Sequence, residues 1–252
     1  MTTVVSIGTT HPWNIAGIGL DLLVGQELGV RVVTVCAAVS AQDAGGLRAL
    51  ETLPAEIVRA QLAAVEGAAV DAVRVGALTS PEIIRLVGDA LRRLHDRPAV
   101  VDPVMSASLG GSFGGPAAVD ALRHEIASLP NVILTPNIAE ARAFLADRPI
   151  GRESLREAAD ELLDFGARAV LLKGGHLDGS PVDALATNDG VELFEGSRIE
   201  GELRGTGCLL AMSLACALAQ GRPLRDAVDF ARGFVRQKIA APREFGGLRV
   251  AY

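Results

Sequence analysis

The chain has 252 residues, 49% of them hydrophobic and only 4% aromatic, a composition typical of α/β domains whose short aliphatic side chains fill the core. The formal net charge of -6 supplies no basic field for a nucleic acid, and no run of about 18 apolar residues is present to span a membrane. Three cysteines without metal-ligand spacing and an N-terminus without a basic, apolar leader lead us to expect a cytoplasmic protein.

Short apolar runs alternate with segments of helical periodicity along most of the chain. The predicted elements are, in order, strand Val4–Gly8, helix Gly17–Leu28, strand Val30–Val39, helix Pro54–Glu66, strand Ala72–Val75, helix Pro81–Leu94, strand Ala99–Val101, strand Val132–Thr135, helix Ala139–Leu145, helix Ser154–Phe165, strand Ala169–Leu172, the hairpin strands Val182–Thr187 and Val191–Glu195, and helix Thr206–Gln220. This order predicts one doubly wound α/β domain over residues 1–252, with a mostly parallel central sheet flanked by helices and a small antiparallel edge hairpin. Ligands of such sheets bind beyond the carboxyl ends of the strands.

The strongest local signal is Gly205-Thr206-Gly207-Cys208, directly before a long apolar segment. It predicts an exposed helix N-terminus, whose free N–H groups and dipole favour a negative charge such as a phosphoryl group. A cysteine in the first helical turn has its thiolate favoured and can accept a proton from an alcohol. The alternative is a glycine turn followed by a small core cysteine.

Lys173 and Gly174 follow another apolar strand. The lysine can reach a phosphate and the glycine lets the backbone approach it closely, although a lysine at a strand end can simply extend its ammonium group to solvent.

Acidic and amide residues follow two further strands. Asp102 and Glu140 can hold Mg²⁺, which favours a few carboxylates together with phosphate oxygens, and Asn137 can orient phosphate or water. The alternatives are a turn role for Asp102 and helix capping for Asn137 and Glu140.

Near the N-terminus, Asp21 and Gln42 could contact the polar edges of a ring, but a first-turn carboxylate and a solvated loop amide are the simpler interpretations. His11, His95 and His124 form no triad or metal pattern, and we expect His95 and His124 to face solvent.

The order of these segments adds information that no single one provides. From end to end the chain resembles the hydroxymethylpyrimidine (phosphate) kinases, which are ribokinase-like, and more distantly the pyridoxal kinases. The matching segments are Ile18–Asp21, Thr34–Gln42, Val73–Leu78, Val100–Met105, Leu134–Glu140, Leu171–His176, Val182–Asp183 and Gly205–Cys208. Cys208 follows Gly-Thr-Gly as in the pyrimidine kinases, whereas most of the superfamily has Asp at that position.

The resemblance implies transfer of phosphate from ATP to the hydroxymethyl group of 4-amino-5-hydroxymethyl-2-methylpyrimidine, and then to its monophosphate. It also implies that the protein is a homodimer. It implies that Cys208 is the base, that the amides of Gly205, Thr206, Gly207 and Cys208 form an anion hole, and that Asp102 and Glu140 position Mg²⁺. It also implies that Lys173, Gly174 and Asn137 bind ATP, and that Ala16, Asp21, Gln42 and Ala77 lie at the acceptor.

The chain departs from the family pattern around the expected acceptor site. Thr9–Ile15 contains the only Trp and replaces a segment that usually carries a Gly-Gly pair. Glu200–Arg204 replaces a Thr-rich stretch, Leu209 a hydroxyl residue and Ala77 a Met, and Phe245-Gly246-Gly247 stands where the family has a Gly/His-rich C-terminus. Two alternatives therefore stay open: a kinase for pyridoxal or another hydroxymethyl heteroaromatic, and a non-catalytic ligand-binding paralogue.

Overall fold

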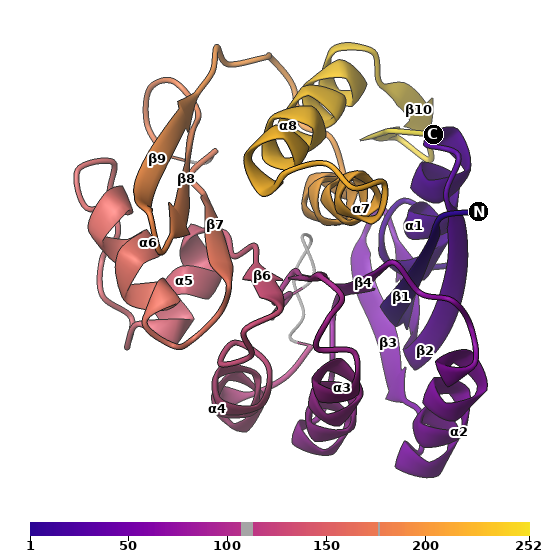
Figure 1. The fold of residues 1–252 in the computed structure, drawn as a ribbon. Helices are drawn as coiled ribbons and strands as arrows, with labels where there is room; N and C mark the ends of the chain where they lie inside the picture. Colours follow the sequence, from indigo (N-terminus) through magenta and orange to yellow (C-terminus); the bar gives the residue numbers. More distant parts are fainter. Residues whose placement is uncertain (107–112, 176) are drawn as a thin grey trace.

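The molecule is organised around one large, mostly parallel sheet (Figure 1). The structure is a computed structural model that describes residues 1–106, 113–175 and 177–252; His176, at the end of one of the matching segments, lies outside the described residues. The nine strands run in the order β3-β2-β1-β4-β5-β6-β7-β8-β9. Their bounds are β1 Thr3–Thr10, β2 Arg31–Asp43, β3 Gly46–Thr52, β4 Ala72–Val75, β5 Ala99–Val101, β6 Val132–Leu134, β7 Ala169–Lys173, β8 Val182–Thr187 and β9 Gly190–Glu195.

In the sheet, the neighbouring strands β2, β1, β4, β5, β6 and β7 pair in parallel. Antiparallel strands lie at both edges. At one edge β3 pairs with β2, and at the other β8 and β9 form the predicted hairpin beside β7. The predictions of a mostly parallel sheet and of an antiparallel edge hairpin are confirmed. All the parallel strands end on the same side of the sheet, so the residues that follow β5, β6 and β7 meet there.

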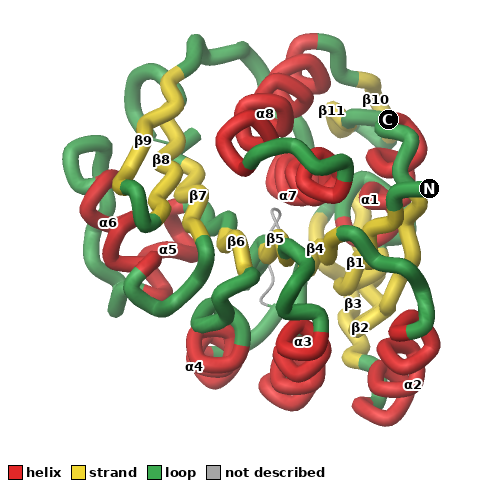
Figure 2. The backbone as a smooth tube through the Cα atoms, viewed as in Figure 1, coloured by secondary structure: helices red, strands yellow, loops and turns green. Residues whose placement is uncertain are grey.

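Helices cover both faces of the sheet (Figures 1 and 2). On one face lie α1 (Gly17–Glu27), α7 (Thr206–Ala219) and α8 (Leu224–Ala240), packed on strand residues such as Val4, Val100 and Ile133. The other face carries α2 (Ala55–Glu66), α3 (Pro81–Arg93), α4 (Pro116–Glu125), α5 (Ile138–Phe144) and α6 (Leu155–Leu163). No helix among the described residues is both long and apolar enough to cross a bilayer.

Four features of the fold are absent from the predicted elements: β3, α4, α8 and the separate two-stranded sheet of β10 (Arg243–Phe245) and β11 (Leu248–Val250). In α8 the buried side chains Ala227, Val228, Ala231 and Phe234 have helical spacing, but they lie among charged residues that obscure the stripe. The strand β3 has one buried residue and otherwise half-buried or exposed ones, so its sequence carries little apolar alternation.

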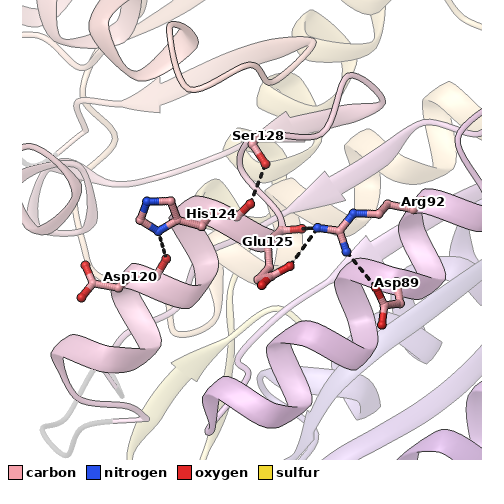
Figure 3. Close-up of polar contacts among 6 residues, drawn as sticks. All are labelled: Asp89, Arg92, Asp120, His124, Glu125 and Ser128. Atoms are coloured by element: carbon pink, nitrogen blue, oxygen red, sulfur yellow. Dashed lines mark hydrogen bonds and ion pairs between the residues drawn. The ribbon is translucent and has the colours of Figure 1, made fainter.

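Helices α3 and α4 are held together at a close backbone approach (Figure 3). Arg92 of α3 contacts Asp89 at 2.8 Å on its own helix and Glu125 at 2.8 Å on α4. Beneath this pair a Cβ atom at Gly88 would lie 2.7 Å from the Glu125 carbonyl oxygen. Glycine at this position therefore sets the distance between the two helices.

A pair of Gly→Ala substitutions tests this contact. Gly88→Ala and Gly233→Ala, the latter in α8 with no described atom within 4 Å of the added Cβ, gain the same helix propensity of about 1 kcal/mol. Only Gly88→Ala forces α4 to move, which costs about 1–3 kcal/mol. Urea unfolding should show that Gly233→Ala is stabilised and is the more stable variant by at least about 1 kcal/mol. Equal stability of the two variants would contradict the proposed close approach.

Candidate active site

The residues that follow β5, β6 and β7 form one connected set at the carboxyl edge of the sheet. The Asp102 N–H donates to the Val75 carbonyl at 2.9 Å, which fixes Asp102 against the end of β4. The Lys173 N–H donates to the Pro136 carbonyl at 2.8 Å, and Lys173 forms an isolated parallel bridge with Asn137. The structure thus brings together three of the predicted phosphate and metal residues.

Lys173 and Asp102 form a buried ion pair across the end of β6. The Lys173 ammonium donates to Asp102 Oδ1 at 2.7 Å, and the side chains are only 15% and 3% exposed. Burial by itself lowers the pKa of Lys173, but the carboxylates of Asp102 and Glu140 outweigh it and raise that pKa above its ordinary value. A fixed positive charge is therefore held at the edge of the sheet.

Asn137 and Glu140 cap α5. The Glu140 N–H donates to Asn137 Oδ1 at 2.9 Å, and the Asn137 N–H donates to Glu140 Oε2 at 2.8 Å. The capping alternative from the sequence is thus present in the structure. Burial raises the pKa of Glu140 to about 7, while Lys173 opposes this shift and Asp102 adds to it. Glu140 therefore shares one electrostatic environment with the ion pair.

Gly174 is required by the backbone next to this pair. A Cβ atom there would lie 2.2 Å from the Val182 carbonyl oxygen. The Gly174 N–H donates to Asp183 Oδ1 at 3.1 Å, and Asp183 in turn accepts from Arg232 of α8 at 2.7 Å. The turn after Lys173 is therefore anchored to β8 and α8.

The N-terminus of α7 points at the ion pair. A Cβ atom on Gly207 would lie 3.2 Å from Asp102 Oδ2 and 3.4 Å from Lys173 Nζ. No described side chain caps this helix, so the first-turn N–H groups of Thr206, Gly207 and Cys208 are left for a ligand or water. Their dipole adds to the positive potential of Lys173, and an arrangement of this kind favours an anion.

Cys208 lies in the first turn of α7, and charged groups influence its thiol. Burial raises the pKa of the Cys208 thiol, and the Arg74 guanidinium opposes that shift, as does the Gly17 N–H. The carboxylates of Asp102 and Asp21 raise the pKa further. The charge balance around the sulfur therefore decides how much thiolate it carries.

The four predicted acceptor residues differ in how deeply they are buried. Ala16 is half-buried at the N-cap of α1, next to Gly17, and Gln42 is half-buried and donates to Ser40 Oγ at 2.9 Å. Ala77 is buried in a small apolar cluster with Phe113. Asp21 is 0% exposed and accepts from Ser6 Oγ at 2.6 Å. A direct contact between Asp21 and an acceptor would therefore require the protein to open around it.

Arg74 was not among the predicted site residues. It is 1% exposed and lies 3.2 Å from Asp21. One sequence signal could have found it, because it is a charged residue inside the otherwise apolar strand Ala72–Val75. The histidine predictions hold for the two exposed residues, since His95 and His124 face solvent, while His11 is buried.

The segments that depart from the family pattern are joined by the C-terminal hairpin β10–β11. The Trp13 and Phe245 rings meet edge to face with centroids 5.1 Å apart, and a Cβ at Gly246 would lie 2.6 Å from the Trp13 ring. The Arg204 N–H donates a hydrogen bond to the carbonyl of Arg249 in the hairpin at 3.0 Å. The rebuilt Thr9–Ile15 segment and the Glu200–Arg204 segment thus share one support.

Comparison with known proteins identifies the family of the chain. The family model described as phosphomethylpyrimidine kinase matches residues 13–250. The chain belongs to the phosphomethylpyrimidine kinase family. It is 40% identical over 231 residues to the hydroxymethylpyrimidine/phosphomethylpyrimidine kinase of Rhizobium meliloti, covering 90% of this chain and 86% of that one.

Solved structures agree with this assignment. Phosphomethylpyrimidine kinase of Clostridium difficile superposes with a TM-score of 0.84 at 30% identity, covering 95% of this kinase and 100% of that chain. Pyridoxal kinase of Bacillus subtilis, solved as an ADP complex, superposes with a TM-score of 0.91 at 26% identity, covering 99% and 96%. The kinase is a phosphotransferase with the ribokinase-like fold that the resemblance implied.

Glycines at the two ends of α7 provide a matched test of the anion site. Gly205 and Gly221 have φ angles of 78° and 84°, so Ala costs about 1–2 kcal/mol of backbone strain at either position. Only at Gly205 does the added Cβ overlap a carbonyl, that of Ile15 at 2.1 Å. We expect both variants to lose stability in thermal unfolding, and Gly205→Ala alone to lose most of its kinase activity.

Equal activities of the two variants would contradict this role of Gly205. If Gly221→Ala and Gly205→Ala keep the same activity per folded molecule, the Gly205 turn does not position the first turn of α7.

Proposed function

We propose that this kinase transfers the γ-phosphoryl group of ATP to the hydroxymethyl group of 4-amino-5-hydroxymethyl-2-methylpyrimidine, of its monophosphate, or of both. The observation that carries the proposal is the position of Cys208 in the uncapped first turn of α7, beside the Lys173–Asp102 ion pair. The relatives' names add support, since the matched curated proteins are called hydroxymethylpyrimidine/phosphomethylpyrimidine kinases. The homodimer and the cytoplasmic location stay predictions.

Each residue of the site has a task in this reaction. Cys208 accepts the proton of the acceptor hydroxyl as that oxygen bonds to the γ-phosphorus and ADP leaves. The N–H groups at the start of α7 hold the equatorial oxygens of the transferring group, where charge accumulates. Lys173 neutralises phosphate charge, and Asn137 orients phosphate or water. Positioning and charge stabilisation account for most of the catalysis in phosphoryl transfer.

Asp102 and Glu140 fit a Mg²⁺ ion of the kind that kinases use. Each is anchored within the protein, Asp102 by Lys173 and Glu140 by the Asn137 N–H. The other ligands of such an ion would be water and phosphate oxygens, as is common for Mg²⁺. When bound, the ion would neutralise charge on the phosphates of ATP.

The second candidate acceptor is pyridoxal or another hydroxymethyl heteroaromatic. It is favoured by the rebuilt Thr9–Ile15 segment, whose Trp13 is committed to the hairpin β10–β11, and by the fit to pyridoxal kinase structures. The chemistry at Cys208 would be unchanged, because both acceptors present a primary alcohol on an aromatic ring.

The acceptor is tested by measuring ADP formation with hydroxymethylpyrimidine, its monophosphate and pyridoxal. We expect turnover with at least one of the two pyrimidines. Turnover with pyridoxal alone would overturn the pyrimidine proposal, and a failure of all three acceptors would overturn both kinase substrates proposed here.

The base is tested with Cys208→Ala. Loss of a general base lowers kcat by about 10²–10⁴-fold, with little change in the KM for ATP. Cys216→Ala is the matched control, because Cys216 lies in the same helix but is fully buried in the core. An activity of Cys208→Ala equal to that of Cys216→Ala would show that the sulfur takes no part.

A further inference from the structure

Arginines of α8 reach across to the edge hairpin β8–β9. Arg225 and Arg232 are seven residues apart, which is about two helical turns, so both lie on the same side of α8. Arg225 contacts Glu192 of β9 at 2.9 Å, and these side chains are 56% and 45% exposed. Arg232 contacts Asp183 of β8 at 2.7 Å, and these side chains are only 13% and 16% exposed. The two ion pairs therefore join the same helix to the same hairpin, one in solvent and one largely buried.

The buried pair has a fixed partner for each of its polar groups that meets the turn or the hairpin. The Arg232 Nε atom donates to Asp183 Oδ2 at 2.7 Å, and its Nη2 atom donates to the Phe194 carbonyl at 2.7 Å. The other carboxylate oxygen of Asp183, Oδ1, accepts from the Gly174 N–H at 3.1 Å. The carboxylate is therefore shared between α8 and the turn after β7, and Arg232 sets its orientation toward that turn.

The turn that Asp183 holds begins at Lys173. The two residues are paired across β7 and β8. The Lys173 N–H donates to the Pro136 carbonyl at 2.8 Å, and the next N–H along the chain, that of Gly174, donates to Asp183. A Cβ atom at Gly174 would lie 2.2 Å from the Val182 carbonyl oxygen, so the turn lies tightly against β8. The main chain that carries the Lys173 side chain is therefore fixed by the protein on both sides.

The hairpin itself has other contacts that keep it in place. Four residue pairs join β7 to β8, and six join β8 to β9. Arg225 and Arg236 also join α8 to this part of the chain, Arg236 through the Ser197 carbonyl at 2.7 Å. Among the described contacts of these arginines, the one made by Arg232 leads to the residue that follows Lys173. Its distinct contribution is an oriented carboxylate at the Gly174 N–H.

We propose that Arg232 and Asp183 are positioning residues for phosphoryl transfer. Arg232 orients the Asp183 carboxylate, this carboxylate holds the Gly174 N–H, and the Lys173 ammonium is thereby kept where it meets the phosphates of ATP. The proposal rests on the proposed role of Lys173 in ATP binding, and neither positioning residue has to touch the nucleotide. A displacement of the lysine by about 1 Å would be enough to weaken its effect on the transferring group.

The first test does not use the kinase reaction. Hydrogen exchange of the Gly174 amide is followed by NMR in the wild type, Arg232→Met and Arg225→Met. In Arg232→Met the Asp183 carboxylate loses its orientation, so the Gly174 amide should exchange at least about tenfold faster than in the wild type. Arg225→Met is the matched control, because both guanidinium groups lie over the Phe194 ring but Arg225 has Glu192 as its hairpin partner. It should leave the exchange of Gly174 unchanged.

Kinetics connect the Gly174 amide to the reaction. In Arg232→Met we expect KM for ATP to rise about tenfold and KM for the pyrimidine acceptor to stay unchanged, because Lys173 is proposed to meet the phosphates of ATP. Arg232→Lys keeps a positive charge for Asp183 and should recover most of this loss, while Arg225→Met should keep wild-type constants. In a Lys173→Gln background, where a donor to Asp102 remains but the ammonium is gone, Arg232→Met should change KM for ATP little further.

The outcomes separate this proposal from the proposed function. Equal Gly174 exchange, or an equal KM for ATP, in Arg232→Met and Arg225→Met would overturn the positioning role. If Gly174 exchanges faster but Lys173→Gln keeps the wild-type KM for ATP and kcat, the contact is real, but the proposed role of Lys173 is wrong and the positioning role is wrong with it. If Arg232→Met does not fold, Arg232→Met/Asp183→Leu, which buries no unpaired charge, replaces it and should show the same faster exchange and higher KM.

Discussion

Charge buried at the carboxyl edge of the sheet has to be compensated inside the protein, and most features of the site follow from this requirement. Lys173 is held by Asp102, and Arg74 is held by Asp21. The first pair keeps a positive charge where phosphate would lie, and the second lies sealed beneath α7. Since a buried charge without a partner costs several kcal/mol, the first pair also ties the end of β5 to β7, and the second ties β4 to α1.

Much of this arrangement could be predicted from the sequence. Apolar runs separated by helical segments define a parallel sheet, and the rule that ligands bind beyond the carboxyl ends placed Asp102, Asn137 and Lys173 together. Arg74 and the burial of Asp21 could not be predicted in this way. A charged residue in an apolar strand draws attention to Arg74, but its burial depends on Gly8 of β1 and on Gly76 just after β4, which the pattern of a four-residue strand does not reveal.

The C-terminal hairpin shows another limit of sequence patterns. The changes at Thr9–Ile15, Glu200–Arg204 and Phe245–Gly247 appear unrelated along the chain, but β10–β11 contacts both earlier segments. The three segments therefore share one structural support. The proposed anion site and Lys173 lie outside this change, so the proposed phosphotransfer residues can be retained while the segments around the proposed acceptor differ.

The account depends on where the acceptor hydroxyl lies relative to Cys208. The most direct measurement is a crystal structure of the kinase with a non-hydrolysable ATP analogue, Mg²⁺ and the pyrimidine acceptor. We predict the hydroxymethyl oxygen within hydrogen-bonding distance of Cys208 Sγ, with the γ-phosphate between Lys173 and the first turn of α7. A hydroxyl that binds away from Cys208, with the γ-phosphate remote from the start of α7, would contradict the account.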